Sequence, residues 1–413
     1  MQGKAGQEAR LAPSFPPARW YARSLGTLSP SLTTDVIVVG AGLSGVITAY
    51  HLAQRGIRVA LIDPRPACPK WFKAEKIEPA QADLFRHFGL MDALLPHCAP
   101  IKAVLDSRGP RVLQAVHLEQ YGIAYYDMVN VVRGIMPSSV DFRLDQAVEA
   151  ETTDDVQTVK LASGAIVTGR LLVMATGAGG ELAAKLKLER EMIRKGHSVA
   201  FGFDIAPAPN RRFDFDSITY YPDSVDSQLA YLTLFRFRTV MRANLFSFRP
   251  MLDDWSRAFL KQPKAKLLEV MPQLPRLIGD FEILSKLESA RIDLYRYIGA
   301  PRPGLIPAAD SGQNVCPTTG SGLTKVLTDC LVLCERIPEW LSTPGMSAAK
   351  TAQWHQDPRK VASDRKSLSG AEYQRSFSTD TSWRWRFHRQ RAYFDMWRSG
   401  GAEARMFTKK LTA

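Results

Sequence analysis

The chain has 413 residues, of which 45% are hydrophobic and 23% charged, and its formal net charge is +13. This composition is typical of a globular protein with apolar material for about two to three domains. No run of about 18 consecutive apolar residues occurs, so the sequence predicts no membrane-spanning helix. The five cysteines show no C-x-x-C pair and no zinc-type spacing, which favours a reducing, cytoplasmic location.

Residues 1–34 carry four basic residues, one acidic residue and several prolines and serines, with no apolar segment of secretory-signal length. We interpret them as a flexible N-terminal extension or the product of a misjudged start site. A transit peptide is the alternative, because the stretch contains Arg and Ser and few acids.

A glycine-rich turn follows the first predicted strand. Residues 35–39 are apolar after Asp35, and the next six read Gly40-Ala41-Gly42-Leu43-Ser44-Gly45, a G-x-G-x-x-G pattern. A helical pattern then leads to a second apolar strand that ends on Asp63. The order of strand, glycine turn, helix, strand and acid predicts a dinucleotide site: the helix N-terminus binds the pyrophosphate and Asp63 binds a ribose.

The segment from Pro64 to Gly196 continues the α/β pattern. We expect a helix over 80–88, strands around a turn at 107–110, a helix over 127–136, a strand over 140–148 and a hairpin around Ser163-Gly164. Residues 171–177 are an apolar strand, which belongs in a parallel sheet beside the first two.

The pattern changes from His197 to Phe248. Short β-branched and aromatic runs separated by Pro, Asp and Ser predict antiparallel strands, followed by helices over 251–260 and 265–271 and a strand over 289–297. Aromatic residues of these strands either line a pocket for a large apolar substrate or form ordinary core, and core is the more frequent outcome. The candidate substrate residues are Tyr220, Tyr231, Phe235 and Phe246.

A second glycine motif lies near residue 320. An apolar strand ends at Asp310, a loop passes through Pro317, and Gly320-Ser321-Gly322-Leu323-Thr324 opens a helix that carries Asp329. The N-terminus of this helix can stabilise negative charge on a ligand.

With both motifs, the chain resembles the FAD-dependent aromatic hydroxylases, which share the para-hydroxybenzoate hydroxylase fold with geranylgeranyl reductases and flavin halogenases. The family pattern G-D-x-x-H, Pro, G-x-G-L-N corresponds to Ala309-Asp310-Ser311-Gly312-Gln313, Pro317 and Gly320 to Thr324. The resemblance implies an α/β protein, with a Rossmann-like FAD-binding domain interleaved with an antiparallel β-sheet substrate domain and followed by a C-terminal helical tail. The implied segments are the extension 1–34, the FAD-binding parts 35–196 and 298–345, the substrate domain 197–297 and the basic helical region 346–413.

The resemblance also assigns cofactor contacts. It implies that the glycine turn, including Leu43 and Ser44, and Asp63 hold the ADP half of FAD. Lys73 falls where the family usually has an arginine over FAD, and Asp310 binds the ribityl chain. The segment at Gly320 and Gly322 presents the amides of Leu323 and Thr324 to the flavin ring.

The implied activity is that of an FAD-dependent monooxygenase. Such an enzyme transfers oxygen from a flavin C4a-hydroperoxide to an aromatic or unsaturated apolar small molecule. O2 is the co-substrate, and NAD(P)H or a partner reductase is the electron source. The family's usual middle Asp-Gly pair is absent, since the chain reads Ala175-Thr176-Gly177 there, and this puts direct use of NADPH in doubt. A flavin-dependent reductase of isoprenoid-type double bonds is the first alternative. A halogenase-like enzyme is a further one, although the W-x-W-x-I-P signature is not met; a non-catalytic FAD scaffold is the third hypothesis.

The C-terminal segment is basic. Residues 351–413 hold 13 Lys or Arg against 6 Asp or Glu, centred on Trp383-Arg384-Trp385-Arg386-Phe387-His388-Arg389. Such a pattern contacts anions such as a membrane surface, or packs a terminal helix against the main domain. We favour packing, treat weak membrane-surface contact as the alternative and do not expect nucleic-acid binding.

Overall fold

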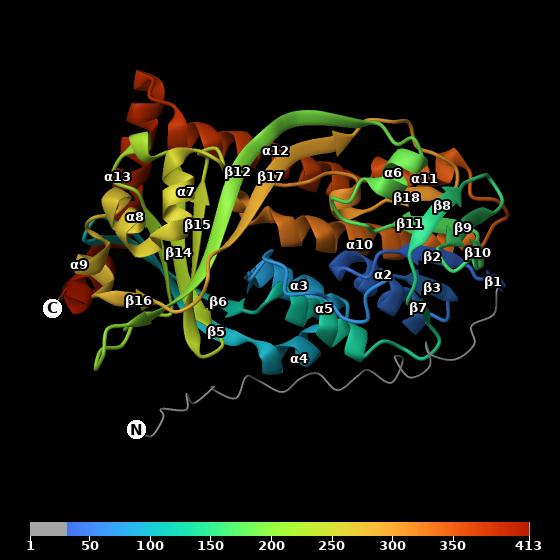
Figure 1. The fold of residues 1–413 in the computed structure, drawn as a ribbon, viewed down its shortest axis with the longest axis horizontal. Coiled ribbons are helices and arrows are strands. Elements are labelled where there is room, and N and C mark those ends of the chain that lie inside the picture. Colours follow the sequence, from blue (N-terminus) through green and yellow to red (C-terminus); the bar gives the residue numbers. More distant parts are fainter. Residues whose placement is uncertain (1–30, 413) are drawn as a thin grey trace, which may run out of the picture.

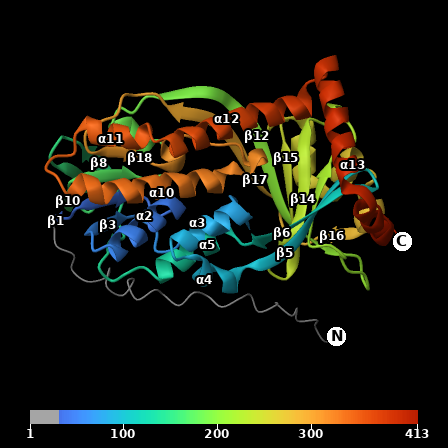
Figure 2. The ribbon, with the colours of Figure 1, turned by 180° about the vertical axis from the view of Figure 1, so that it is seen from behind.

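The computed structural model describes residues 31–412. Figures 1 and 2 show an elongated molecule with a parallel sheet at one end and a large antiparallel sheet at the other. Most of the predicted N-terminal extension lies outside the described residues. Its end, however, is strand β1 (Ser31–Thr33), which pairs in parallel with β10 (Ile166–Gly169). The prediction of a flexible extension up to residue 34 is therefore wrong for these three residues, because the ladder with β10 holds their backbone.

The parallel sheet has the strand order β18-β11-β2-β3-β7. Its strands are β2 (Val36–Val39), β3 (Val59–Ile62), β7 (Asp141–Arg143), β11 (Leu171–Met174) and β18 (Leu305–Pro307). Every residue of β2, β3 and β11 is buried, as expected for strands covered on both faces. Val36 lies opposite both Val59 and Leu171, which confirms that the three predicted apolar strands are neighbours.

Alternate residues of β2 face two different layers. Val36 and Val38 pack with the helices α2 (Leu43–Gln54), α5 (Tyr125–Gly134) and α10 (Ser321–Leu341). Ile37 and Val39 face a small sheet of order β1-β10-β9-β8 together with α6. The remaining elements of this layer are β8 (Ala147–Glu151), β9 (Gln157–Leu161) and α6 (Glu181–Lys185). The single strand predicted over 140–148 is therefore two strands, β7 and β8, which belong to different sheets.

The large sheet has the order β16-β12-β15-β14-β13-β5-β6-β4, and β17 pairs with β12. Its strands are β4 (Lys76–Ile77), β5 (Ala99–Arg108), β6 (Arg111–Gly122), β12 (Arg190–Pro207), β13 (Ser217–Tyr221), β14 (Leu229–Phe237), β15 (Val240–Ser247), β16 (Phe281–Ile283) and β17 (Glu288–Tyr297). Its pairs are antiparallel except for β13 with β5. This confirms the antiparallel strands predicted over residues 197–248 and the further strand predicted over 289–297.

The boundary predicted between residues 196 and 197 does not separate the two sheets. Strand β12 crosses it without interruption, and β4, β5 and β6 from the first predicted FAD-binding segment belong to the large sheet. The predicted boundary is misplaced because the large sheet depends on tertiary contacts. Strands β13 and β5 form a parallel pair between segments more than a hundred residues apart, and no local sequence pattern encodes such a pairing.

Helices cover the outside of the molecule. They are α3 (Pro79–His87), α4 (Met91–Leu94), α7 (Asp254–Lys261), α8 (Pro263–Val270), α9 (Leu274–Ile278), α11 (Ala348–His355), α12 (Pro358–Thr379) and α13 (Trp383–Thr412), with short 3-10 turns η1 (Leu95–His97), η2 (Val225–Ser227), η3 (Ala309–Ser311) and η4 (Pro317–Thr319). The C-terminal segment is helical, as predicted, and α13 bends at Gly401. Within residues 31–412, no helix is long and apolar enough to cross a membrane.

Candidate active site

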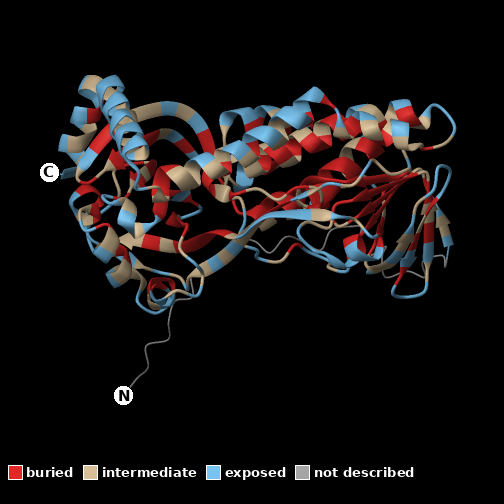
Figure 3. Ribbon diagram, turned by 90° about the horizontal axis from the view of Figure 1, so that it is seen from above, coloured by how far each residue is buried: buried red, intermediate tan, exposed pale blue. Residues whose placement is uncertain are grey.

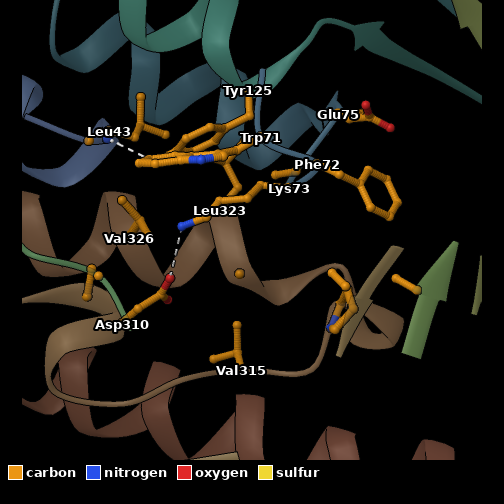
Figure 4. A pocket seen from close by; sticks show the side chains of 18 of the residues that line it. Leu43, Trp71, Phe72, Lys73, Glu75, Tyr125, Asp310, Val315, Leu323 and Val326 are labelled. Carbon is orange, nitrogen blue, oxygen red and sulfur yellow. Dashed lines mark hydrogen bonds and ion pairs between the residues drawn. The ribbon is translucent and has the colours of Figure 1, made fainter. Parts of the chain in front are cut away.

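The candidate site is a cavity of about 340 Å³ at the junction of the two sheets. One end is lined by the first glycine turn and by residues 175–177, which follow β11, and the other by strands β14, β15 and β17 of the large sheet. The segment around Lys73 and the loop from Asp310 to Gly322 form opposite walls (Figure 4). The cavity therefore brings together both glycine motifs and the predicted aromatic strands.

The first glycine turn is held by close backbone packing. Gly40 has φ +102°, and a Cβ atom there would lie 2.4 Å from the carbonyl oxygen of Ala175. A Cβ on Gly45 would lie 1.9 Å from the carbonyl oxygen of Gly40. Only glycine permits these approaches, so the turn places Gly40, Gly42 and the start of α2 at the cavity wall. Gly45 itself does not line the cavity; it sets the distance between α2 and the turn.

Asp63 lies at the end of β3, as predicted, and lines the cavity while remaining buried. Its carboxylate accepts hydrogen bonds from the Ala41 amide at 2.9 Å and from the Arg65 amide and guanidinium at 2.9–3.1 Å. Burial acts to raise the pKa of Asp63, but these hydrogen bonds and the nearby Arg133 guanidinium outweigh burial and hold the pKa below its ordinary value. Asp63 is therefore an ionised acceptor at the glycine turn.

Two residues not singled out from the sequence complete this end. Arg133 of α5 donates hydrogen bonds from Nε and Nη2 to the Ala41 carbonyl oxygen, at 3.1 and 2.5 Å. Tyr125 presents its hydroxyl to the Leu43 amide at 3.2 Å, at the N-terminus of α2 (Figure 4). Tyr125 begins α5 and Arg133 lies near its end. No local motif could identify them, because their role depends on how α5 and α2 are placed.

Lys73 reaches across the cavity. Its ammonium group lies 3.6 Å from the Asp310 carboxylate, 5.2 Å from the Tyr125 ring centroid and 5.8 Å from that of Trp71 (Figure 4). Burial acts to lower the pKa of Lys73, but the facing Tyr125 and Asp310 side chains outweigh it and raise the pKa. The structure therefore places the predicted Lys73 and Asp310 on facing walls, with a protonated amine directed into the cavity.

The Asp310 segment is anchored by helix α10. Ala309 has φ +52°, a conformation that non-glycine residues seldom adopt. Its amide donates to the Asp329 carboxylate at 3.0 Å, and Lys325 pairs with the same oxygen at 2.7 Å. This buried pair fixes the backbone that carries Asp310.

The second glycine motif opens α10 as predicted. Gly320 has φ +64°, and Gly320, Gly322 and Leu323 line the cavity. A Cβ on Gly322 would lie 3.2 Å from Cγ2 of Val315. Thr324 is not among the lining residues; its hydroxyl accepts a hydrogen bond from Gln81 at 3.0 Å, which attaches α3 to α10.

Three of the four predicted substrate residues face the cavity, namely Tyr231, Phe235 and Phe246. The Tyr231 hydroxyl donates to the Thr318 carbonyl oxygen at 2.7 Å, so this aromatic wall contacts the loop before α10. Tyr220 does not line the cavity: it is fully buried in the core packed beneath α7 to α9. The prediction for Tyr220 is corrected accordingly, because its register on β13 directs the side chain to the opposite sheet face.

Polar side chains also lie beside this aromatic wall. Asn244 of β15 lines the cavity, and its Oδ1 has no hydrogen-bond partner within the described part of the chain. Beside it, buried Glu75 accepts a hydrogen bond from Arg242 at 2.9 Å. Burial raises the pKa of Glu75, although the Arg242 guanidinium opposes this shift. Glu75 thus joins Arg242 and Asn244 of β15 in a polar rim, although it is 167 residues away from Arg242 in sequence.

The arrangement fits a bound FAD. The glycine turn and the α2 N-terminus suit a pyrophosphate, Asp63 suits a ribose, Lys73 suits phosphate charge and the α10 N-terminus suits the flavin ring. Any side chain at Gly40 or Gly45 would overlap with backbone atoms and distort the turn that forms this end of the site. Among residues 31–412 no group of three or more His, Cys, Asp and Glu side chains could hold a metal ion. Fold and site thus define a flavin-binding protein of the dinucleotide-binding α/β class.

Comparison with known families agrees with the geometry. The model of the FAD binding domain family matches residues 33–343. The chain therefore belongs to this FAD-binding family, and the predicted resemblance to the FAD-dependent hydroxylases is confirmed at the level of family.

The chain is similar to known hydroxylases only over short segments. The chain is 39% identical over 61 residues to aklavinone 12-hydroxylase RdmE of Streptomyces purpurascens, covering 15% of this chain and 11% of that protein. It is 30% identical over 92 residues to 3-(3-hydroxy-phenyl)propionate/3-hydroxycinnamic acid hydroxylase 1 of Burkholderia vietnamiensis, covering 22% and 15%. The matched region thus spans less than a fifth of these relatives. A 22% identity to capsanthin/capsorubin synthase of Capsicum annuum extends over 359 residues, or 79% of this chain and 66% of that protein.

Similarity to solved structures extends over most of the chain. p-Nitrophenol 4-monooxygenase PnpA from Pseudomonas putida superposes with a TM-score of 0.71 at 16% identity, covering 92% of this chain and 97% of that one. A variant of Klebsiella pneumoniae HpxO, solved with FAD, gives 0.66 at 16% identity, covering 91% and 97%. These similarities establish the shared fold.

Proposed function

We propose that the protein is an FAD-dependent monooxygenase that acts on an aromatic or otherwise apolar small molecule. The observation that carries the proposal is the continuity of one cavity from the flavin-suited α10 N-terminus to an aromatic wall. Tyr231 links the two parts directly, since it lines the cavity and donates to Thr318 of the loop before α10. A substrate on this wall lies against the segment that would hold the flavin ring.

The chain's own groups account for binding, orientation and exclusion of water. When bound, FAD supplies the redox chemistry that activates O2 for transfer of one oxygen atom to the substrate. The α10 N-terminus at Gly322 and Leu323 favours negative charge on the ring. Tyr231, Phe235 and Phe246 provide apolar surface for the substrate, and Asn244 provides a polar group at its edge. The names of the hydroxylase relatives support this choice of substrate class.

The direct test measures FAD content and O2-dependent turnover. The purified protein is expected to contain FAD and to convert a phenol or polycyclic aromatic, with consumption of NADPH or NADH and O2. If neither nucleotide reduces the flavin, the assay is repeated with a partner reductase. Conversion that proceeds equally well without O2 would instead support the reductase of isoprenoid-type double bonds. Absence of FAD would overturn both.

A pair of Tyr→Phe variants tests the proposed substrate wall. Tyr231→Phe removes the hydrogen bond to Thr318, whereas Tyr220→Phe changes a buried tyrosine outside the cavity. We expect Tyr231→Phe to lower product formed per NAD(P)H oxidised while FAD content stays unchanged. Tyr220→Phe is the matched control and should leave that ratio unchanged. Equal ratios in both variants would contradict the placement of the substrate.

A further inference from the structure

Helix α13 carries large aromatic side chains on its solvent side. Trp383 is 74% exposed and Phe387 65% exposed, and Phe394 and Trp397 are exposed as well. Their spacings of four, seven and three residues each approximate whole helical turns, so the four side chains lie along one face. An ordinary surface helix carries polar residues on this face.

The helix is fixed to the molecule by its opposite face. Trp385 packs edge-on against Tyr373 with ring centroids 5.5 Å apart, and Arg389 donates to the Phe377 carbonyl oxygen at 2.9 Å. Tyr393 lies under the guanidinium of Arg108 at 4.5 Å. The packing predicted for this segment therefore holds for Trp385 and Arg389. It is wrong for Trp383 and Phe387, which point away from the protein body.

The second part of α13 also holds the helix in place. After the bend at Gly401, Ala404 is buried, and Glu403 approaches His117 of β6 at 2.6 Å. Gly400 fits so closely that a Cβ there would lie 2.0 Å from the Leu113 carbonyl oxygen. The exposed aromatic face is therefore presented by a docked helix, visible as largely exposed ribbon in Figure 3.

Arginines border the aromatic residues. By helical position, Arg384, Arg391 and Arg398 lie along one side of the strip and Arg386 along the other, and all four are exposed. Asp395 is the one acidic residue of Trp383–Ser399, and it approaches Arg391 and Arg398 only at 3.7 and 3.9 Å. We call Trp383, Phe387, Phe394, Trp397 and these four arginines the aromatic-arginine face.

We infer that the aromatic-arginine face binds the surface of an anionic lipid bilayer, with α13 lying in the plane of the interface. Tryptophan and phenylalanine enter the boundary between headgroups and acyl chains, and flanking arginines pair with anionic headgroups. A second copy of the chain fits less well, since it would bring two arginine-bordered strips of the same charge together. Contact from one helix face, with no spanning segment among the described residues, makes the association peripheral.

The test is co-sedimentation of the full FAD-loaded protein with vesicles. We expect binding to vesicles of phosphatidylcholine with about 30% phosphatidylglycerol, about tenfold weaker binding when the salt concentration is raised from about 0.1 to about 0.5 M, and little binding to pure phosphatidylcholine. The variant Trp383→Ser/Phe387→Ser should need at least tenfold more lipid for half-maximal binding. The matched control Leu252→Ser/Leu284→Ser removes two exposed apolar residues elsewhere and should bind like the parent protein.

A second variant tests the arginines of the aromatic-arginine face, in case the aromatic variant loses stability. Arg384→Gln/Arg391→Gln retains the aromatic residues and should weaken binding to anionic vesicles at low salt by several-fold, with thermal unfolding and FAD content unchanged. Failure of the parent protein to bind anionic vesicles would overturn the inference. So would equal binding by the parent and both variants. A concentration-dependent dimer in sedimentation velocity that the aromatic variant abolishes would assign the face to a second copy instead.

Discussion

Substitution of Gly45 by alanine tests the packing that positions the FAD site. The added Cβ would lie 1.9 Å from the Gly40 carbonyl oxygen, and a separation of at least 3.0 Å is needed to avoid overlap. The first turn of α2 must therefore move by more than about 1 Å relative to the glycine turn. Because Leu43 and Ser44 lie in the same helical turn, their amides move with it.

The expected magnitude follows from two opposing contributions. Alanine in place of glycine within a helix favours folding by about 1 kcal/mol. Overpacking against a fixed backbone costs about 1–3 kcal/mol or more, and the overlap at Gly45 is with backbone, which cannot rotate away. We expect the free energy of unfolding of Gly45→Ala to fall by up to about 2 kcal/mol, which is the difference between these two contributions. We also expect its Kd for FAD to rise at least tenfold, which corresponds to about 1.4 kcal/mol.

Urea unfolding of the apoprotein measures the first quantity, and quenching of FAD fluorescence measures the second. The matched control is Gly134→Ala, since Gly134 also lies in a helix and an added Cβ there meets no atom within 4 Å. The control should leave the Kd for FAD unchanged, and its free energy of unfolding should stay the same or rise by up to about 1 kcal/mol, because nothing opposes the gain in helix propensity. If Gly45→Ala behaves like Gly134→Ala in both assays, close packing at Gly45 does not position the FAD site.

Three further predictions concern the cofactor and pH. Asp63→Ala should raise the Kd for FAD by a factor corresponding to about 1–3 kcal/mol, through loss of a ribose partner; an unchanged Kd in fluorescence titration removes Asp63 from the site. Gly322→Leu should keep the fold by circular dichroism but lose flavin or O2-dependent product formation, because its Cβ would lie 3.2 Å from Val315; normal turnover contradicts this. Burial lowers the pKa of His197 to about 4 from 6.5. As the pH falls, the unfolded state takes up this proton before the folded state does. His197 therefore contributes stability that is present above pH 6.5 and is lost as the pH falls towards 4. We expect the free energy of unfolding to fall by about 2 kcal/mol between about pH 7 and 5 from this residue. Replacement by phenylalanine should reduce this decrease in urea unfolding, whereas an unchanged pH dependence refutes the assignment.

The sequence by itself determined the elements whose geometry is local. Gly40 adopts a positive φ at the end of an apolar strand, and the pattern of glycines predicts both the turn and the helix that follows. The apolar runs of β2, β3 and β11 are recognisable because strands buried on both faces need no alternation. Asp63 and Asp310 each closely follow a strand of the parallel sheet, so the sequence could also place both of them near the ligand.

Tertiary structure decided which side chains share the cavity. Tyr220 and Tyr231 look alike in sequence, but strand register sends one into the core and the other to the cavity wall. Arg133, Tyr125 and Asn244 carry no motif, and they reach the site only through the packing of α5 on α2 and the position of β15 in the large sheet. The pairing of β5 with β13 likewise joins segments that no local pattern connects. On α13, helical period alone aligns the exposed aromatic residues, but only the docking of Trp385 and Arg389 shows which face remains in solvent, because burial is a property of the assembled fold.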